Sequence, residues 1–136
     1  MDVDLRPALA NAVIVVDGRY ALQHRDDNPA IPWPGHWGLF GGAIEPDEAA
    51  DVAIVREIEE ELGLTATFRL LWSTDDHRDW SGHRRQLYVF ETDVTASWAQ
   101  HRLGEGQGVG VFDADALPTP IAPVARDMIA RHRRGQ

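Results

Sequence analysis

Runs of β-branched and aromatic residues, partly alternating with polar ones, predict strands in several parts of the chain. The stretch "NAVIVVDGRYALQHR" predicts two strands around a turn at Asp17 and Gly18. The segments "TATFRLLWSTD" and "RRQLYVFETDV" predict an antiparallel pair. Short strands are predicted at "LFGG" and at "GVGVFDA".

Two segments show the apolar spacing of amphipathic helices. The first runs from about Asp47 to Leu62, with Pro46 suited to its first turn and Gly63 suited to the position after its last turn. The second, "APVARDMIARHRR", predicts a closing helix. Several strands with two separated helices predict an α/β chain in which the helices pack on a mixed β-sheet.

The composition is that of an ordinary globular protein and predicts a single domain over residues 1–136. Of the 136 residues, 43% are hydrophobic and 26% are charged. The absence of cysteine from the sequence excludes disulfides, thiolate zinc sites and cysteine nucleophiles, and it allows a reducing cytoplasm. Any metal must therefore bind through oxygen or imidazole.

The formal net charge of −9 argues against a nucleic-acid surface, because such surfaces neutralise phosphates with Lys and Arg. A small polyanionic substrate could still bind if divalent cations supplied positive charge. The run "ALANAVIVV" is too short to span a membrane, and the acidic start "MDVD" does not resemble a signal peptide. These features predict a cytoplasmic protein without a nucleic-acid or membrane partner, and they leave a homodimer open.

The segment "REIEEELG" places four glutamates within six positions of the first predicted helix. On a helical wheel, Glu57, Glu60 and Glu61 fall within an arc of about 100° beside an apolar stripe, whereas Glu59 points away. Three converging carboxylates offer hard oxygen ligands for Mg²⁺ or Mn²⁺, and Arg56 lies where it could brace Glu60. An ordinary charged helix face is the alternative.

The residues around this cluster carry a more specific pattern. The stretch "GAIEPDEAADVAIVREIEEELGL", from Gly42 to Leu64, matches G-x5-E-x7-R-E-U-x-E-E-x-G-U, where U is aliphatic. This stretch resembles the Nudix box. The order of predicted elements is similar to a Nudix domain over nearly the whole chain. The fixed positions of the box are Gly42, Glu48, Arg56, Glu57, Glu60, Glu61 and Gly63.

The resemblance implies an α/β/α sandwich and a hydrolase that uses Mg²⁺ or Mn²⁺. It implies cleavage of a phosphoanhydride bond in a nucleoside diphosphate linked to another group, as in a nucleoside triphosphate or a nucleotide sugar. By the same similarity, Glu57, Glu60 and Glu61 and the carbonyl of Gly41 are metal ligands. Glu57 is also a candidate base, and Arg56 belongs to the catalytic set.

Residues outside the box complete the expected site. Arg25 is expected to contact substrate phosphate by similarity, and an ion pair with Asp26 or Asp27 is the alternative. Trp33 and Trp37 could stack on a base, with core packing as the alternative for Trp37.

A late loop supplies one more candidate. By similarity, Glu105 in "LGEGQG" is a metal ligand or the base, and an ordinary loop acid is the alternative. His83 and His101 are weaker candidates for proton transfer.

Two departures from familiar Nudix patterns bear on the substrate. Phe40 precedes the glycine pair where proline is common, and Ile121 occupies the place of an asparagine that reads oxidised guanine in some triphosphatases. Isoleucine offers no side-chain hydrogen bond, so oxidised dGTP is not expected as the main substrate. A nucleotide-sensing module without turnover is the alternative function. Isomerisation of an isoprenoid diphosphate is less favoured, because a cysteine would be expected.

Overall fold

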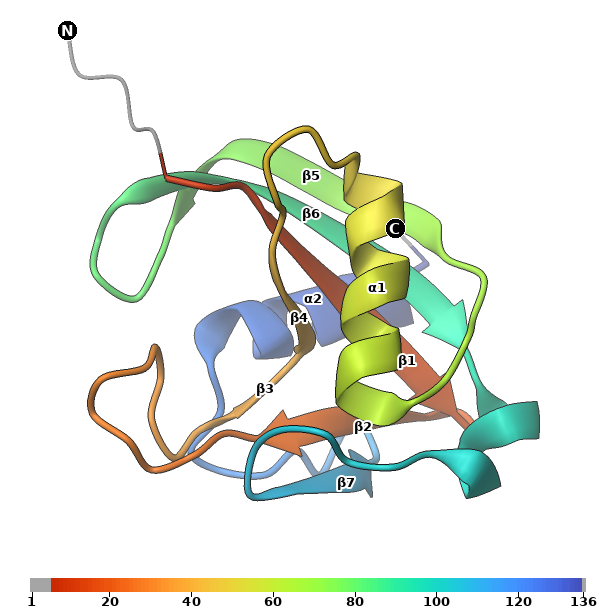
Figure 1. Ribbon diagram of the computed structural model, residues 1–136. Helices are drawn as coiled ribbons and strands as arrows, with labels where there is room; N and C mark the ends of the chain where they lie inside the picture. The colour runs from red at the N-terminus through yellow and green to blue at the C-terminus, as the bar shows by residue number, and fades with distance from the viewer. Residues whose placement is uncertain (1–5, 136) are drawn as a thin grey trace, which may run out of the picture.

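The computed structural model describes residues 6–135. Within them, seven strands, two α-helices and a short 3-10 helix follow one another along the chain (Figure 1). The strands are β1 (Leu9–Val16), β2 (Arg19–His24), β3 (Trp37–Gly38), β4 (Phe40–Ala43), β5 (Arg69–Arg78), β6 (Arg84–Asp93) and β7 (Gly108–Phe112). The helices are α1 (Ala50–Leu62), η1 (Thr95–Gln100) and α2 (Pro123–Arg133).

The strands form one mixed sheet with the order β3-β2-β1-β6-β5. The central strand β1 runs parallel to β6 and antiparallel to β2 and β4, and β7 pairs with β2. Residues Leu9 to Ala12 of β1 pair with β4, whereas Ile14 to Val16 pair with β2. The pairing places the glycines of β4 beside the middle of the sheet.

Each face of the sheet is covered by one helix (Figure 1). Successive side chains of a strand point to opposite faces, so Ala12 and Ile14 of β1 join the core beneath α1, whereas Val13 joins the core beneath α2. From α1, Ile54 and Ile58 are fully buried in the first core. The predicted α/β/α sandwich with a mixed sheet is confirmed.

Helix α1 begins three residues later than the predicted start at Asp47. Asp47 has a backbone φ of 63°, a left-handed conformation that a right-handed helix cannot include. Pro46 therefore belongs to the preceding loop. The predicted C-terminal end is confirmed, because Gly63 adopts a φ of 65° and its N–H bonds the carbonyl of Glu59.

The predicted hairpin turn at Asp17 and Gly18 and the antiparallel pairing of β5 with β6 are confirmed. The 3-10 helix η1 was not predicted. Among residues 6–135, no helix is long and apolar enough to cross a membrane. The acidic start, Met1 to Asp4, lies outside the described residues.

Candidate active site

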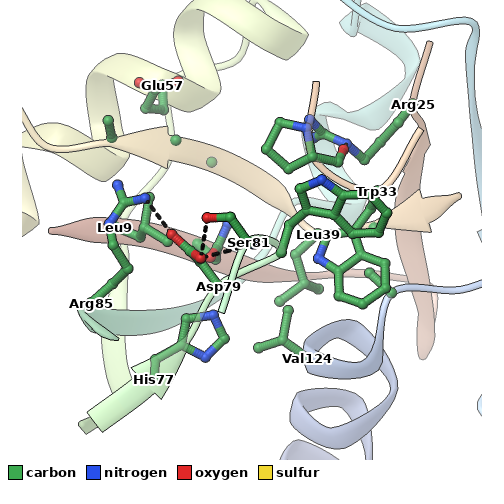
Figure 2. A pocket seen from close by; sticks show the side chains of 18 of the residues that line it. Leu9, Arg25, Trp33, Leu39, Glu57, His77, Asp79, Ser81, Arg85 and Val124 are labelled. Carbon is green, nitrogen blue, oxygen red and sulfur yellow. Dashed lines mark hydrogen bonds and ion pairs between the residues drawn. The ribbon is translucent and has the colours of Figure 1, made fainter. Parts of the chain in front are cut away.

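A cleft of about 640 Å³ opens where β4, the C-terminal part of α1, the loop after β2 and the β5–β6 turn approach one another. Figure 2 shows Arg25 and Trp33 on one side of it, Asp79 and Arg85 on the other, and Glu57 beyond them. Six predicted site residues line the cleft. They are Arg25, Trp33, Gly41, Glu57, Glu60 and Glu105.

Glu61 is the most deeply buried of the clustered carboxylates, at 2% exposed. It lies on the side of α1 that faces the sheet, because it follows Ile54 and Ile58 by whole helical turns. Its Oε1 accepts a hydrogen bond of 2.8 Å from the N–H of Gly41. The pKa of Glu61 is raised to about 8, chiefly by burial and in smaller part by the nearby Glu57 and Glu105 carboxylates, against the effect of that hydrogen bond.

Glycines let β4 approach these carboxylates closely. A Cβ atom on Gly42 would lie 2.9 Å from both carboxylate oxygens of Glu57. Gly41 has a φ of 139°, and a Cβ there would lie 2.1 Å from the carbonyl oxygen of Ala10. Burial raises the pKa of Glu57, against the opposing effect of its hydrogen bond from Arg56. Backbone and carboxylate oxygens thus share a small space in which the Glu57 side chain is 13% exposed.

Arg56 ties the helix to the loop before it. Its Nε and Nη2 donate to the two carboxylate oxygens of Glu48, each at 2.8 Å. Its Nη1 donates to Glu57 at 3.0 Å and more weakly to Glu60 at 3.4 Å. The hydrogen bond from Arg56 lowers the pKa of Glu48 to about 2, and the same contact raises the pKa of Arg56. Arg56 therefore braces Glu48 and Glu57 more firmly than Glu60, the partner expected from the helical wheel.

The loop carrying Glu105 is attached to both sides of the cleft by hydrogen bonds. The N–H of Gly104 donates to the carbonyl of Glu61 at 2.8 Å, and the side chain of Gln23 donates to the carbonyl of Glu105 at 3.1 Å. The amide of Gln107 donates to the carbonyl of Arg25 at 2.8 Å. In the described part of the chain, no hydrogen bond or ion pair engages the Glu105 carboxylate. It faces the same cleft as Glu57.

The other predicted residues divide between the cleft and the core. Arg25 lines the cleft and donates from Nε to the carbonyl of Pro32 at 2.7 Å. Trp33 also lines the cleft. Trp37 does not: it stacks on His24 at 4.6 Å and contacts Phe112 in the core beneath α2, which is the packing alternative.

The weaker candidates are engaged elsewhere. His101 stacks on Trp98, and its Nδ1 lies 2.6 Å from the Trp98 carbonyl oxygen. His83 bonds Ser81 within the β5–β6 turn. Ile121 packs against the core beneath α2 rather than lining the cleft.

The likeness to the Nudix family extends well beyond the box. The sequence model of the NUDIX domain matches residues 5–132. The chain belongs to the NUDIX family. The predicted relationship is therefore confirmed over nearly the whole chain, well beyond the box itself.

Individual Nudix proteins support this assignment. The crystal structure of a MutT NUDIX hydrolase from Burkholderia pseudomallei has a TM-score of 0.79 at 31% identity, covering 94% of this chain and 98% of that one. The NUDIX domain of Shewanella oneidensis NrtR, crystallised with ADP ribose, has a TM-score of 0.79 over 98% of this chain and 90% of that one. At 20% identity, this second likeness concerns the fold alone.

A curated relative matches a shorter part of the chain. Nucleoside triphosphatase NudI from Escherichia coli O1:K1 is 38% identical over 79 residues, which are 54% of this chain and 55% of NudI. NudI from Salmonella arizonae is 49% identical over 47 residues, 35% of this chain and 33% of that protein. The chain thus spans about half the length, or less, of the curated relatives that it matches.

The Nudix site suits a divalent cation by the chemistry of its donors. Carboxylate and backbone oxygens are the ligands that Mg²⁺ and Mn²⁺ prefer, and Glu61 is a buried carboxylate beside a second one. Within residues 6–135, no group of three or more acidic or histidine side chains is already gathered to hold a metal ion. Glu61 and Glu57 instead accept hydrogen bonds from the Gly41 amide and Arg56. A bound cation would therefore compete with these bonds.

Sequence reasoning missed the contribution of the β5–β6 turn. Asp79, Trp80 and Ser81 line the cleft although they lie far along the chain from the box, and Arg85 lines it from β6. One signal was present in the sequence: a tryptophan stands inside the otherwise polar turn "RDWSGHR". Its position relative to Trp33 depends on the sheet order, which the sequence pattern does not give.

Proposed function

We propose that this chain is a single-domain, divalent-metal-dependent pyrophosphohydrolase of the cytoplasm. It cleaves a phosphoanhydride bond in a nucleoside diphosphate joined to another group, either a nucleoside triphosphate or a nucleotide sugar. The observation that carries the proposal is the convergence of Glu57, Glu60 and Glu105 with Arg25 on one cleft, while Glu61 lies behind Gly41.

The carboxylates cannot bind a diphosphate by themselves, because both partners are negative. Glu57, Glu60, Glu61 and the Gly41 carbonyl would hold Mg²⁺ or Mn²⁺, which when bound offsets the phosphate charge and acidifies water. Arg25 contributes a permanent positive charge in the same cleft, suited to a phosphate oxygen. The site thus combines cation ligands with a direct phosphate contact.

Hydrolysis requires water to form a bond to phosphorus while the bridging P–O bond breaks and the water loses a proton. We assign the acceptance of that proton to Glu105, because its carboxylate faces the cleft and no arginine among residues 6–135 bonds it. Glu57, in contrast, accepts a hydrogen bond from Arg56. Arg56 acts on the reaction through Glu57, because its bonds to Glu48 and Glu57 fix the position of the Glu57 carboxylate.

The names of the relatives bear on the substrate class. The NudI proteins are nucleoside triphosphatases, which favours a nucleoside triphosphate, and they share sequence with part of this chain. The complex of the NrtR domain with ADP ribose is consistent with a nucleoside diphosphate joined to a sugar. Both compounds contain the phosphoanhydride bond that the proposed chemistry requires.

The decisive experiment is a screen of nucleoside triphosphates, nucleotide sugars and dinucleoside polyphosphates with Mg²⁺ and with Mn²⁺, followed by phosphate release. Glu60→Gln should lose most turnover, since a neutral amide is a poorer cation ligand. Glu59→Gln is the matched control, because Glu59 lies on the same helix but bonds Thr65 outside the cleft. Equal activity of the two variants in saturating Mg²⁺ would refute the assignment. Binding without turnover of any compound would identify a sensing module instead.

A further inference from the structure

Two tryptophans from distant parts of the chain meet at the cleft. Trp33 lies in the loop between β2 and β3, and Trp80 lies in the turn between β5 and β6. Their ring centroids are 4.9 Å apart and their planes are inclined by 63°. Both line the same cleft as Arg25, Glu57 and Glu105. The two rings therefore form an aromatic corner, defined as Trp33 and Trp80, with one ring edge against the other's face.

The exposure of Trp80 is unusual for so large an apolar side chain. It is 48% exposed, although burying an aromatic side chain is normally favourable. A loose turn would be the simplest explanation, but the turn is held firmly. Asp79 accepts hydrogen bonds from Ser81 N–H and Oγ at 2.9 and 2.8 Å and from His83 N–H at 2.9 Å. The turn thus keeps an apolar ring in water at the cleft.

A second anchor ties this turn to the rest of the molecule. Arg85 donates from Nη1 to Asp79 at 3.0 Å and from Nε to the carbonyl of Pro7 at 2.7 Å. The side chains of Arg85 and Asp79 are only 14% and 12% exposed, so this ion pair is largely shielded from water. Figure 2 shows Asp79 pointing back toward Arg85 and Ser81 rather than into open space.

Trp33 is also held in place. Its backbone has a φ of 49°, an uncommon conformation for a residue with a side chain. The carbonyl of Trp33 accepts a bond from the N–H of His36 at 3.2 Å, and the neighbouring carbonyl of Pro32 accepts one from Arg25. Its ring also meets the ring of His36 edge to face at 5.4 Å. The corner therefore exists before any ligand arrives, which limits the entropy lost on binding.

We propose that the aromatic corner of Trp33 and Trp80 is the stacking site for the nucleobase of the substrate. This inference rests on the proposed function, because it assigns the base of the same nucleotide whose phosphates meet Arg25 and the carboxylates. Leu39 and Val124 line the cleft nearby and add apolar surface. A planar aromatic group can lie on one indole face while the edge of the second indole limits its position.

The corner recognises the planar shape of the base rather than its hydrogen-bonding edge. Both carboxylate oxygens of Asp79 are engaged within the turn, and Ser81 Oγ bonds Asp79 and His83. Aromatic side chains stack on every base because each has a π face. The four common bases should therefore bind with similar affinity, and Trp80, which sequence reasoning missed, should contribute to that affinity.

The test uses GMP and ribose 5-phosphate, titrated calorimetrically in Mg²⁺. Neither compound contains a phosphoanhydride bond, so binding is measured without turnover. Trp80→Ala should weaken GMP binding by about 5- to 150-fold, which corresponds to about 1–3 kcal/mol per stacked base. It should leave the affinity for ribose 5-phosphate unchanged, because that ligand has no base. Trp80→Phe, which keeps an aromatic face, should restore most of the GMP affinity.

Trp98→Phe is the matched control, since Trp98 lies in η1 and stacks on His101 away from the cleft. Its affinity for GMP should equal that of the unaltered protein. Unchanged GMP affinity in Trp80→Ala, or an equal loss for both ligands, would overturn the inference. Base binding that depends on Trp80 without hydrolysis of any nucleoside triphosphate, nucleotide sugar or dinucleoside polyphosphate would refute the proposed function alone. Circular dichroism of Trp80→Ala checks that the fold persists.

Discussion

Replacing Glu61 with glutamine should change how the stability of the metal-free protein depends on pH. Glu61 is almost fully buried, and burial raises its pKa from the ordinary value of 4.5 to about 8. The folded protein therefore holds a proton that the unfolded chain has released between these two values. It follows that stability falls as pH rises from about 4.5 to about 8 and is lowest above that window.

The size of this effect follows from the two pKa values. They differ by about 3.5, and each pKa unit corresponds to about 1.36 kcal/mol. The full loss is thus at most about 5 kcal/mol above pH 8, of which about 3.5 kcal/mol falls between pH 5 and pH 8. In Glu61→Gln this contribution is absent, because the amide does not ionise. Its carbonyl oxygen can still accept the hydrogen bond from Gly41.

The measurement is urea unfolding at several pH values in the presence of a chelator. The free energy of unfolding of the unaltered protein should fall with pH more steeply than that of Glu61→Gln, whereas Glu59→Gln should follow the unaltered protein. Adding Mg²⁺ should raise stability at pH 8 in the unaltered protein and much less in Glu61→Gln. If the free energy of unfolding changed with pH in the same way for the unaltered protein and Glu61→Gln, the pKa of Glu61 would not be raised by burial.

Three further results are expected. Arg56→Ala should lower Mg²⁺ affinity by about 10–100-fold, because Glu57 would lose the bond that positions it. If a titration showed unchanged Mg²⁺ affinity, the role of Arg56 would be limited to its structural bond with Glu48. Glu105→Gln should lower kcat by about 10²–10⁴-fold with little change in KM; a kcat close to that of the unaltered protein would move the base to another residue. The preference for 8-oxo-dGTP over dGTP in kcat/KM should stay below about a thousandfold, because Ile121 packs against the core beneath α2 and a stacking site tolerates every base.

Contacts within one helix were predictable, whereas contacts between elements were not. The helical period places Glu57, Glu60 and Glu61 on one side of α1 and Glu59 away from them, as the structure shows. The same period suggested Glu60 as the main partner of Arg56. The principal partner is Glu48, because the left-handed turn at Asp47 brings that carboxylate back toward the helix.

The aromatic corner is a second contact between elements that the sequence pattern could not predict. Trp33 was predicted from its loop, but its neighbour Trp80 enters from a different hairpin. Only the sheet order, with β1 between β2 and β6, brings these two loops to one side of the molecule (Figure 1). Likewise, Trp37 was a stacking candidate from its place before "LFGG", yet its strand pairs with β2 and directs it against the core.

The four clustered glutamates of α1 differ in their surroundings. Glu60, with its side chain 59% exposed, is solvated, and Glu59 bonds Thr65. Arg56 compensates Glu57, but Glu61 is left buried and, among residues 6–135, accepts one hydrogen bond, from a backbone amide. A leucine there would stabilise the helix more, since it would bury apolar surface without desolvating a carboxylate. Local rules are broken in this way mainly at functional sites. A divalent cation bound to Glu61 would offset the cost of burying its ionised carboxylate. The burial of Glu61 is therefore unfavourable in the metal-free protein for the same reason that the proposed activity requires a metal.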